Sequence, residues 1–422
     1  MKNYNIREDP EFKRIMQKHD LSKDTKNVYA NTLKIFCDTN QKPYHQIVEE
    51  IKEEQYDRID EENHRIIRYN PDTGKIQQYI ENYLNHFKNN GNKPNSIKNR
   101  QNHLRTVLRK SDLILPKPQK INYPYTRKTI LGKKDIQSIL QTSNIHHKAL
   151  ISFLATTGLR IHDALNQLTI EKFIEATSEH HHYYEVDEFI NYAPHDITPY
   201  WVFTPYKTRK LGLECKVCNT PETTHYLLQS LQERQRILES KGDTVELEDP
   251  LFVSRETSYK KPLNRTSVSA LFWHKNKIFK QNKKEQLQKQ LEEQKITYKQ
   301  YKDNISNIPK FHPHGLRHFF ITTIRNYTTN HDISLIMEGH ASPYKMDKHY
   351  IGSNEELFSD KVIQDTYEQI IPYLTFNQEI DPVEYQELLL QKKVNEELRV
   401  EQEKQRKLLE NIIKNSGIDK LL

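Results

Sequence analysis

The sequence predicts a mainly helical protein, with a helical first domain and a mixed α+β second domain that holds a small antiparallel sheet. Apolar residues recur at helical spacing through the first hundred or so residues, whereas residues 211–217 alternate between apolar and other side chains. A chain of 422 residues is long enough for two or three domains. We expect domains over residues 1–115 and 129–376, joined by a linker at 116–128, and a C-terminal helix or tail at 377–422.

The first domain begins with a helix start signal around Ser22. Tyr29, Leu33 and Phe36 follow at positions i, i+4 and i+7, so they share one face of a helix. A second helix is expected to begin near Pro94. The acidic residues 49–62 between the two helices predict a solvated helix or a loop.

A basic run follows the second predicted helix. Between Lys93 and Lys134 there are twelve Lys and Arg residues and a single acid, Asp112, so the local balance of +11 exceeds the +7 of the whole chain. Residues 116–128 hold three prolines and no helical period, which predicts an extended linker. A run of one sign favours the phosphate backbone of double-stranded DNA as partner over a merely solvated face. The residues assigned to DNA binding are Lys93, Lys98, Arg100, Arg105, Arg109, Lys117, Lys120, Arg127 and Lys128.

In the second domain, residues 146–157 suit a buried helix, and residues 200–203 are strand-like. Residues 207–210 would then form the tip of a hairpin that continues into the alternating strand. Residues 281–304 are rich in Lys, Gln and Glu and predict an exposed helical insertion. The polar segment at 382–422 has only loose heptad spacing, which disfavours a strong coiled coil.

Composition excludes several classes of protein. No run of apolar residues exceeds four, so no segment could span a membrane, and no signal peptide is expected. Three cysteines cannot form a disulfide framework and fit a reducing cytoplasm. Cys215-x-x-Cys218 and the histidines at 180–182 raise the possibility of zinc, but a second Cys pair is lacking and a buried strand explains Cys215. We expect neither a metal nor another cofactor.

Three short stretches carry chemistry. In the first, Arg160 follows a glycine at a helix start, and Asp163 lies three residues later, where a carboxylate could orient the guanidinium or form an ordinary salt bridge. In the second, His314 and Arg317 share one helix face, where a surface pair or a phosphate site would both fit.

The third stretch begins at Gly339, which is expected to cap a buried helix. His340 follows directly, and Tyr350 lies ten residues later. With 24 tyrosines and 20 histidines in the chain, this pair acquires meaning only together with the other two stretches.

Taken in order, the pattern Arg…Lys…His-x-x-Arg…Gly-His…Tyr resembles that of the tyrosine recombinase (phage-type integrase) superfamily. The helical first segment resembles the core-binding domain of that family, and residues 129–376 resemble its catalytic domain. Residues 207–222 and 350–356 look most like the archaeal members.

The resemblance implies a set of site residues. The catalytic positions fall on Arg160, Lys207, His314, Arg317, His340 and Tyr350, with Asp163 and His318 in support. Lys210 competes with Lys207 for the position of the catalytic lysine. Tyr350 is one residue farther from His340 than the commonest family spacing, and Tyr344 is too close to be a comfortable substitute.

The activity implied is site-specific cleavage and exchange of DNA strands through a 3′-phosphotyrosyl intermediate, without metal or ATP, to integrate or excise a mobile element. Lys207 suits the general acid, and His314 the base or a phosphate donor. The resemblance also implies a homotetramer on paired DNA sites, associated with DNA in the cytoplasm. Two alternatives remain: a nicking and resealing enzyme similar to type IB topoisomerases, and an inactive DNA-binding protein of the same fold.

Overall fold

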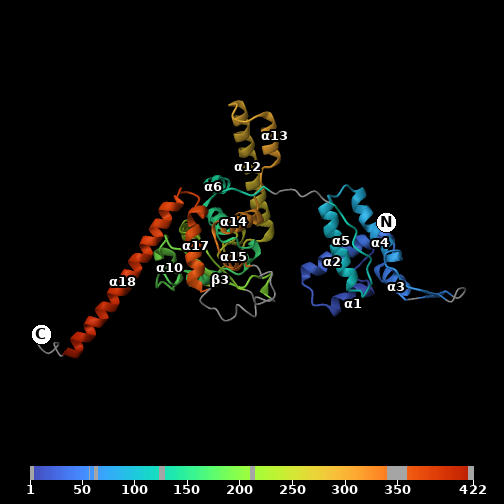
Figure 1. Cartoon of the computed structure of the whole chain (residues 1–422), viewed down its shortest axis with the longest axis horizontal. Helices are drawn as coiled ribbons and strands as arrows, with labels where there is room; N and C mark the ends of the chain where they lie inside the picture. Colours follow the sequence, from blue (N-terminus) through green and yellow to red (C-terminus); the bar gives the residue numbers. More distant parts are fainter. Residues whose placement is uncertain are drawn as a thin grey trace. The chain divides into compact units, whose positions relative to one another are not determined.

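The computed structural model describes residues 4–56, 58–60, 65–122, 129–209, 214–339 and 359–416. The chain divides into two compact units, Met1–Arg127 and Lys128–Leu422 (Figure 1). The prediction of a mainly helical protein with a small antiparallel sheet is confirmed.

The first unit is built from helices and one short β-hairpin. Ser22 begins the second helix as predicted, because its side chain accepts the N–H of Thr25. The first helix was not predicted, and the side chain of Asp9 caps it. The helices are α1 (Pro10–Lys18), α2 (Lys23–Asn40), α3 (Tyr44–Glu54), α4 (Lys75–Asn89) and α5 (Pro94–Arg109).

The core of the first unit forms where α2 packs against α4 and α5. Leu33 and Phe36 are fully buried there, and the ring of Phe36 meets that of Tyr83 edge-on at 6.0 Å. The acidic stretch is in part the helix that was expected, because residues 49–54 belong to α3. The chain then enters β1 (Arg58–Asp60), which was not predicted and pairs antiparallel with β2 (Arg65–Ile67). Strands of three residues are too short to give a period-two signal.

The described part of the predicted linker, residues 116–122, is attached to the first unit. The backbone N–H of Lys117 donates to Asp72 at 2.9 Å, and Lys88 donates to the side chain of Gln119 at 3.3 Å. Ile121 packs against the core of this unit. Residues 123–128 lie outside the described ranges.

In its described residues, the second unit combines helices with one small sheet. β3 (Tyr200–Phe203) and β4 (Cys215–Cys218) pair antiparallel, with Tyr200 opposite Cys218. The helices of this unit are α6 (Lys133–Gln141), α7 (Ile145–Thr157), α8 (Ile161–Asn166), α9 (Ile170–Thr177), α10 (Val186–Tyr192), α11 (Pro221–Glu239), α12 (Arg265–Glu292), α13 (Tyr298–Ser306), α14 (Pro313–Tyr327), α15 (His331–Glu338), α17 (Asp360–Leu374) and α18 (Pro382–Ser416).

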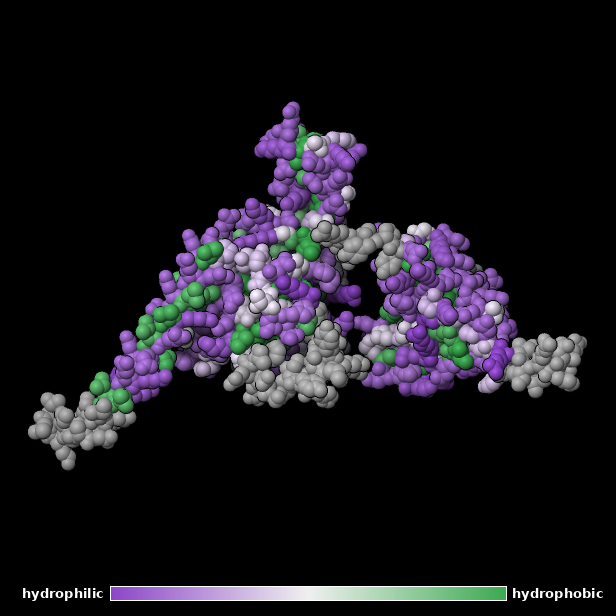
Figure 2. Space-filling view, in the orientation of Figure 1, coloured by the Kyte–Doolittle hydropathy of each residue, from purple (hydrophilic) through white to green (hydrophobic). Residues whose placement is uncertain are grey.

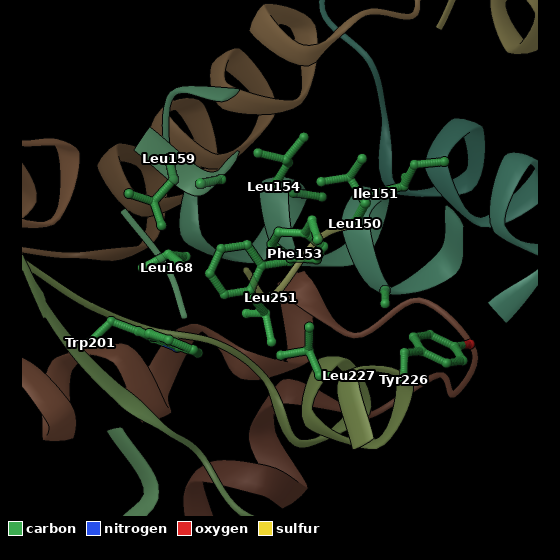
Figure 3. Packing of buried hydrophobic residues seen from close by; sticks show 14 of the residues in the cluster. Leu150, Ile151, Phe153, Leu154, Leu159, Leu168, Trp201, Tyr226, Leu227 and Leu251 are labelled. Carbon is green, nitrogen blue, oxygen red and sulfur yellow. The ribbon is translucent and has the colours of Figure 1, made fainter. Parts of the chain in front are cut away.

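Helix α7 is the centre of the second core, as its apolar sequence predicts. Every residue from Ala149 to Thr157 is buried, and α7 packs against both α11 and α14. Phe153 meets the ring of Trp201 on β3 edge-on at 5.2 Å (Figure 3). Burying a large apolar side chain of this kind contributes about 1.5–3 kcal/mol to the stability of the fold. The packing of α7 therefore fixes the position of the residues at its ends.

Two helical elements of the second unit extend from its core. The expected insertion forms a hairpin of α12 and α13 with a mainly hydrophilic surface (Figures 1 and 2). Helix α18 is 35 residues long, and hydrophobic residues such as Leu390, Leu398 and Leu408 are exposed along it (Figure 2). None of the helices described is both long and apolar enough to cross a bilayer.

The three cysteines, Cys37, Cys215 and Cys218, are buried free thiols. Over the described ranges, the structure contains no cluster of three or more His, Cys, Asp or Glu residues suited to a metal ion. The burial of Cys215 on β4 agrees with the strand pattern.

Candidate active site

The turn between α7 and α8 positions the first candidate arginine. Helix α7 ends at Gly158, whose φ of +62° is left-handed, and a Cβ there would lie 2.1 Å from the ring of Phe320. Only glycine fits both conditions. Arg160 is the N-cap residue of α8 and is half-buried. Within the described residues, no hydrogen bond or ion pair engages the side chain of Arg160.

Arg317, on α14, is held rigidly beneath this turn. It is only 5% exposed, and its Nη1 and Nη2 donate to the carbonyl oxygens of Gly158 and Glu338, each at 2.5 Å. Burial, together with the positive charge of Arg160, lowers the pKa of Arg317 to about 10. The structure therefore brings the two predicted arginines together and fixes one of them to the ends of two helices.

Asp163 does not make the predicted contact with Arg160. Its carboxylate is buried, and Oδ1 accepts the backbone N–H of Tyr206 at 3.0 Å and the amide of Gln167 at 2.9 Å. The expectation that Asp163 orients Arg160 is corrected: the carboxylate anchors the segment that follows β3. This contact spans 43 residues, so helical spacing could not have revealed it.

The anchored segment carries Lys207. Lys207 is exposed in a turn after β3, as predicted for the hairpin tip. Next to it, the ring of Tyr206 contacts two groups: the ring of His162, at 4.7 Å between ring centroids, and the guanidinium of Arg209, at 4.3 Å from the ring centre. Lys210, the alternative to Lys207, lies outside the described residues.

His314 and His318 lie on the first turns of α14. His312 caps this helix, with Nδ1 accepting the N–H of Gly315 at 2.9 Å. His314 is exposed, and its ring meets that of His318 edge-on at 4.4 Å. The N-terminus of α14 thus presents His314 on the helix that also supplies Arg317, three residues later.

The end of α15 completes the described part of the site. Arg325 holds the carboxylate of Glu338 with two hydrogen bonds of 2.7 Å, a pair that the sequence pattern did not suggest. Cys215 donates to the carbonyl oxygen of Met337 at 3.4 Å, and burial raises the pKa of its thiol to about 12. The helix ends at Gly339 with φ +59°. His340 and Tyr350, the candidate nucleophile, follow and lie outside the described residues, as does Tyr344.

The predicted DNA-binding residues of the first unit differ in accessibility. Arg100 packs its guanidinium 4.1 Å from the ring centre of Phe87, and Lys98 is half-buried. Arg105 is only 7% exposed, and burial lowers its pKa, so its side chain is poorly placed for the predicted contact with DNA. The exposed members are Lys93, Arg109, Lys117 and Lys120, while Arg127 and Lys128 lie outside the described residues.

The charged and polar groups of the described site suit an anion. Two guanidiniums, an imidazole and a helix N-terminus lie on neighbouring segments, and the nearest buried carboxylates, those of Asp163 and Glu338, are committed to other donors. Guanidiniums present planar donor pairs that match the oxygens of a phosphate.

Comparisons with known proteins give low similarity. No family model and no curated protein matches the chain. Among solved structures, the chain is similar to XerA recombinase at 16% identity, covering 85% of this chain and 96% of that one, with a TM-score of 0.33. It is similar to the Tn1549 transposon integrase in complex with transposon right end DNA at 14% identity, covering 82% and 98%, with a TM-score of 0.46. It is also similar to a lambda integrase tetramer bound to a Holliday junction at 11% identity, covering 80% and 74%, with a TM-score of 0.39. At these values no family is assigned, and the functional proposal rests on the residues of this chain.

Proposed function

We propose that the protein is a tyrosine site-specific recombinase that cleaves and rejoins double-stranded DNA, to integrate or excise a mobile element. The observation that supports this best is the closeness of the two arginines: the buried Arg317 donates to the carbonyl oxygen of Gly158, two residues before Arg160. One guanidinium is fixed and the other is unengaged within the described residues, which suits a phosphodiester bound between them.

In the proposed reaction, the phenolic oxygen of Tyr350 attacks a DNA phosphorus. A Tyr–O–P bond forms, the bond from phosphorus to the 5′-oxygen breaks, and the 3′-phosphate remains on the protein. His314 takes the phenol proton as base, and Lys207 gives a proton to the leaving 5′-oxygen. His340 serves as a further donor to the phosphate. Rejoining reverses the same steps, so neither ATP nor a metal is required.

The roles of the two arginines follow from their surroundings. Arg317 is preorganised by two carbonyl oxygens, so its position changes little when negative charge develops on the phosphate. Stabilisation by a fixed donor of this kind is worth on the order of 10²–10³ in rate. Arg160, on the turn capped by Gly158, supplies the second charge.

The exposed lysines and arginines of the first unit are proposed to bind the backbone of duplex DNA. Contacts to phosphate position a protein without reading sequence. The proposed active form is a homotetramer on paired DNA sites in the cytoplasm. We also propose that the chain is most similar to the archaeal members of the family.

A nicked suicide substrate tests the proposal directly. The full chain should form a covalent DNA adduct that Tyr350→Phe abolishes, whereas the matched control Tyr344→Phe should retain it. An adduct that survives Tyr350→Phe would move the nucleophile elsewhere, and no adduct with the wild-type chain on any DNA would favour an inactive DNA-binding protein. Efficient relaxation of supercoiled DNA without a defined site would favour the alternative similar to type IB topoisomerases.

A further inference from the structure

A separate cavity of about 170 Å³ lies in the second unit, between the start of α7, the middle of α11 and the start of α12. Residues 251–255 close another side, and Leu251, one of the apolar lining residues, is labelled in Figure 3. None of the proposed catalytic residues lines this cavity. The polar groups in its wall therefore serve a purpose other than the proposed DNA cleavage.

Arg234 of α11 is the most deeply buried charge in the cavity wall, at 1% exposure. Its Nη1 donates to the carbonyl oxygen of Pro250 at 2.8 Å, and its Nη2 to Asp249 at 2.6 Å. Its Nε is buried and has no hydrogen-bond partner among the described residues. Because buried polar groups are nearly always paired, an unpaired Nε–H in a cavity wall indicates a missing acceptor.

The charged side chains that line the cavity are both positive. Behind them, Asp249 pairs with Arg234 at 2.6 Å, and Lys260 lies 3.1 Å from Asp243 and 3.7 Å from Asp249, so two carboxylates face Arg234 and Lys260. Arg255 lies at the exposed edge of the cavity, and no described residue pairs with it. The residues that line the cavity include no Asp or Glu.

Two histidines add polar groups without adding charge. His146 is hydrogen-bonded through Nδ1 to Ser230 at 2.8 Å. Burial lowers the pKa of both imidazoles, and that of His147 falls to about 4, so they remain neutral near pH 7. A neutral imidazole can donate one hydrogen bond and accept another. The opposite side of the cavity is apolar and is formed by Leu231, Phe252 and Leu271, among others.

We propose that this cavity binds a small organic anion, with its acidic head toward Arg234 and Arg255 and its apolar body against Leu231 and Phe252. The head is a carboxylate or a phosphate, since both present acceptor oxygens to a guanidinium. The cavity is smaller than the roughly 300–1,000 Å³ of sites for drug-sized ligands, so the ligand is compact. The proposal does not depend on DNA cleavage.

Benzoate and phenyl phosphate serve as probes because they carry the two head groups on one apolar ring, and benzyl alcohol is their neutral counterpart. Titration calorimetry on the full chain should give saturable binding of at least one anion, with a Kd below about 1 mM. Preference for one anion identifies the head group. A Kd above about 1 mM for both anions would overturn the proposal, and so would binding of benzyl alcohol as tight as that of the anions.

Matched variants locate the binding. Ser267 of α12 lines the cavity, whereas Ser269 on the same helix is exposed, so Ser267→Phe should abolish binding and Ser269→Phe should retain it. Arg255→Gln should weaken binding by about tenfold, and Arg236→Gln on an exposed face of α11 should leave it unchanged. Because Arg255 is exposed, its replacement leaves the core intact. Equal affinities for Ser267→Phe and Ser269→Phe would place the ligand elsewhere and refute the assignment.

Discussion

The carboxylate of Asp163 accepts the backbone N–H of Tyr206 at 3.0 Å, one residue before Lys207. A buried acid on α8 thus fixes the start of the segment that presents the proposed general acid. Since Arg160 occupies the N-cap position of the same short helix, α8 links the position of one proposed catalytic side chain to that of another.

Asp163→Ala should therefore slow DNA cleavage and lower the free energy of unfolding by about 1–3 kcal/mol, because the N–H of Tyr206 and the amide of Gln167 would lose their partly buried hydrogen bonds. Asp163→Asn keeps an acceptor oxygen at Oδ1 and should retain most of both properties. Urea unfolding and single-turnover cleavage measure the two effects. If Asp163→Asn reduced cleavage and stability as much as Asp163→Ala, the negative charge of Asp163, and not its hydrogen bond to Tyr206, would be responsible for both effects.

The two arginines should separate activity from stability. Arg160→Ala should reduce cleavage by on the order of 10²–10³ while leaving the free energy of unfolding unchanged or higher, because it removes a charge that repels Arg317. Arg317→Ala should abolish cleavage and lower stability by at least about 2 kcal/mol, since the carbonyl oxygens of Gly158 and Glu338 would be left without a charged donor. Both variants are compared by single-turnover kinetics and urea unfolding. Strong destabilisation by Arg160→Ala would show that its guanidinium has a structural partner.

Gly158→Ala should destabilise the second unit by several kcal/mol. The backbone at Gly158 is left-handed, which costs a residue with a Cβ about 1–2 kcal/mol. The added Cβ would also overlap with the ring of Phe320. Gly242 has φ +73° and empty space around it, so Gly242→Ala shows the backbone cost alone. Thermal and urea unfolding compare the two variants, and Phe320→Leu should restore part of the stability of Gly158→Ala. Equal destabilisation at both glycines would contradict the packing described.

His147 should make the second unit acid-sensitive. Its pKa is lowered from 6.5 to about 4 by burial and by the nearby Lys275, His146 and Arg255. The unfolded chain therefore binds the extra proton between pH 6.5 and 4, so the stability contributed by neutral His147 is complete above pH 6.5 and declines as the pH falls toward 4. The decline is at most about 3 kcal/mol.

Urea unfolding from pH 4 to 8 tests this with His147→Gln, which should flatten the difference between pH 4 and 6.5. The control is His274→Gln, which replaces an exposed histidine on α12 and should follow the wild-type curve. Parallel curves for wild type and His147→Gln would contradict the assignment.

DNA binding should depend steeply on salt, and the first unit offers a matched comparison. Removing the exposed Lys117 or Lys120 should reduce the slope of log K against log salt by about 0.9 for each phosphate that the protein no longer neutralises. Arg105→Leu should leave the slope unchanged because Arg105 is buried. Fluorescence anisotropy at several salt concentrations measures the slopes. An equal effect of Arg105→Leu would return Arg105 to the DNA-binding surface.

The sequence predicted those helices and strands whose formation depends on residues close together in the chain. The apolar run of α7, the cap at Ser22 and the alternation around Cys215 each act over a few residues, so the elements followed from the sequence. The partner of Asp163 and the Arg325–Glu338 pair depend on tertiary contacts and could not be read in this way. The burial of Arg105 had a signal, because it continues the apolar stripe of α5 that begins at Ile97.

The two carbonyl oxygens that hold Arg317 lie at the C-terminal ends of α7 and α15. Each such end carries roughly half an elementary negative charge from the aligned peptide dipoles. Two helices together can thus serve as the counterion for one guanidinium. A carboxylate in that place would bring a full negative charge that repels an incoming phosphodiester, whereas each helix end carries only a partial charge.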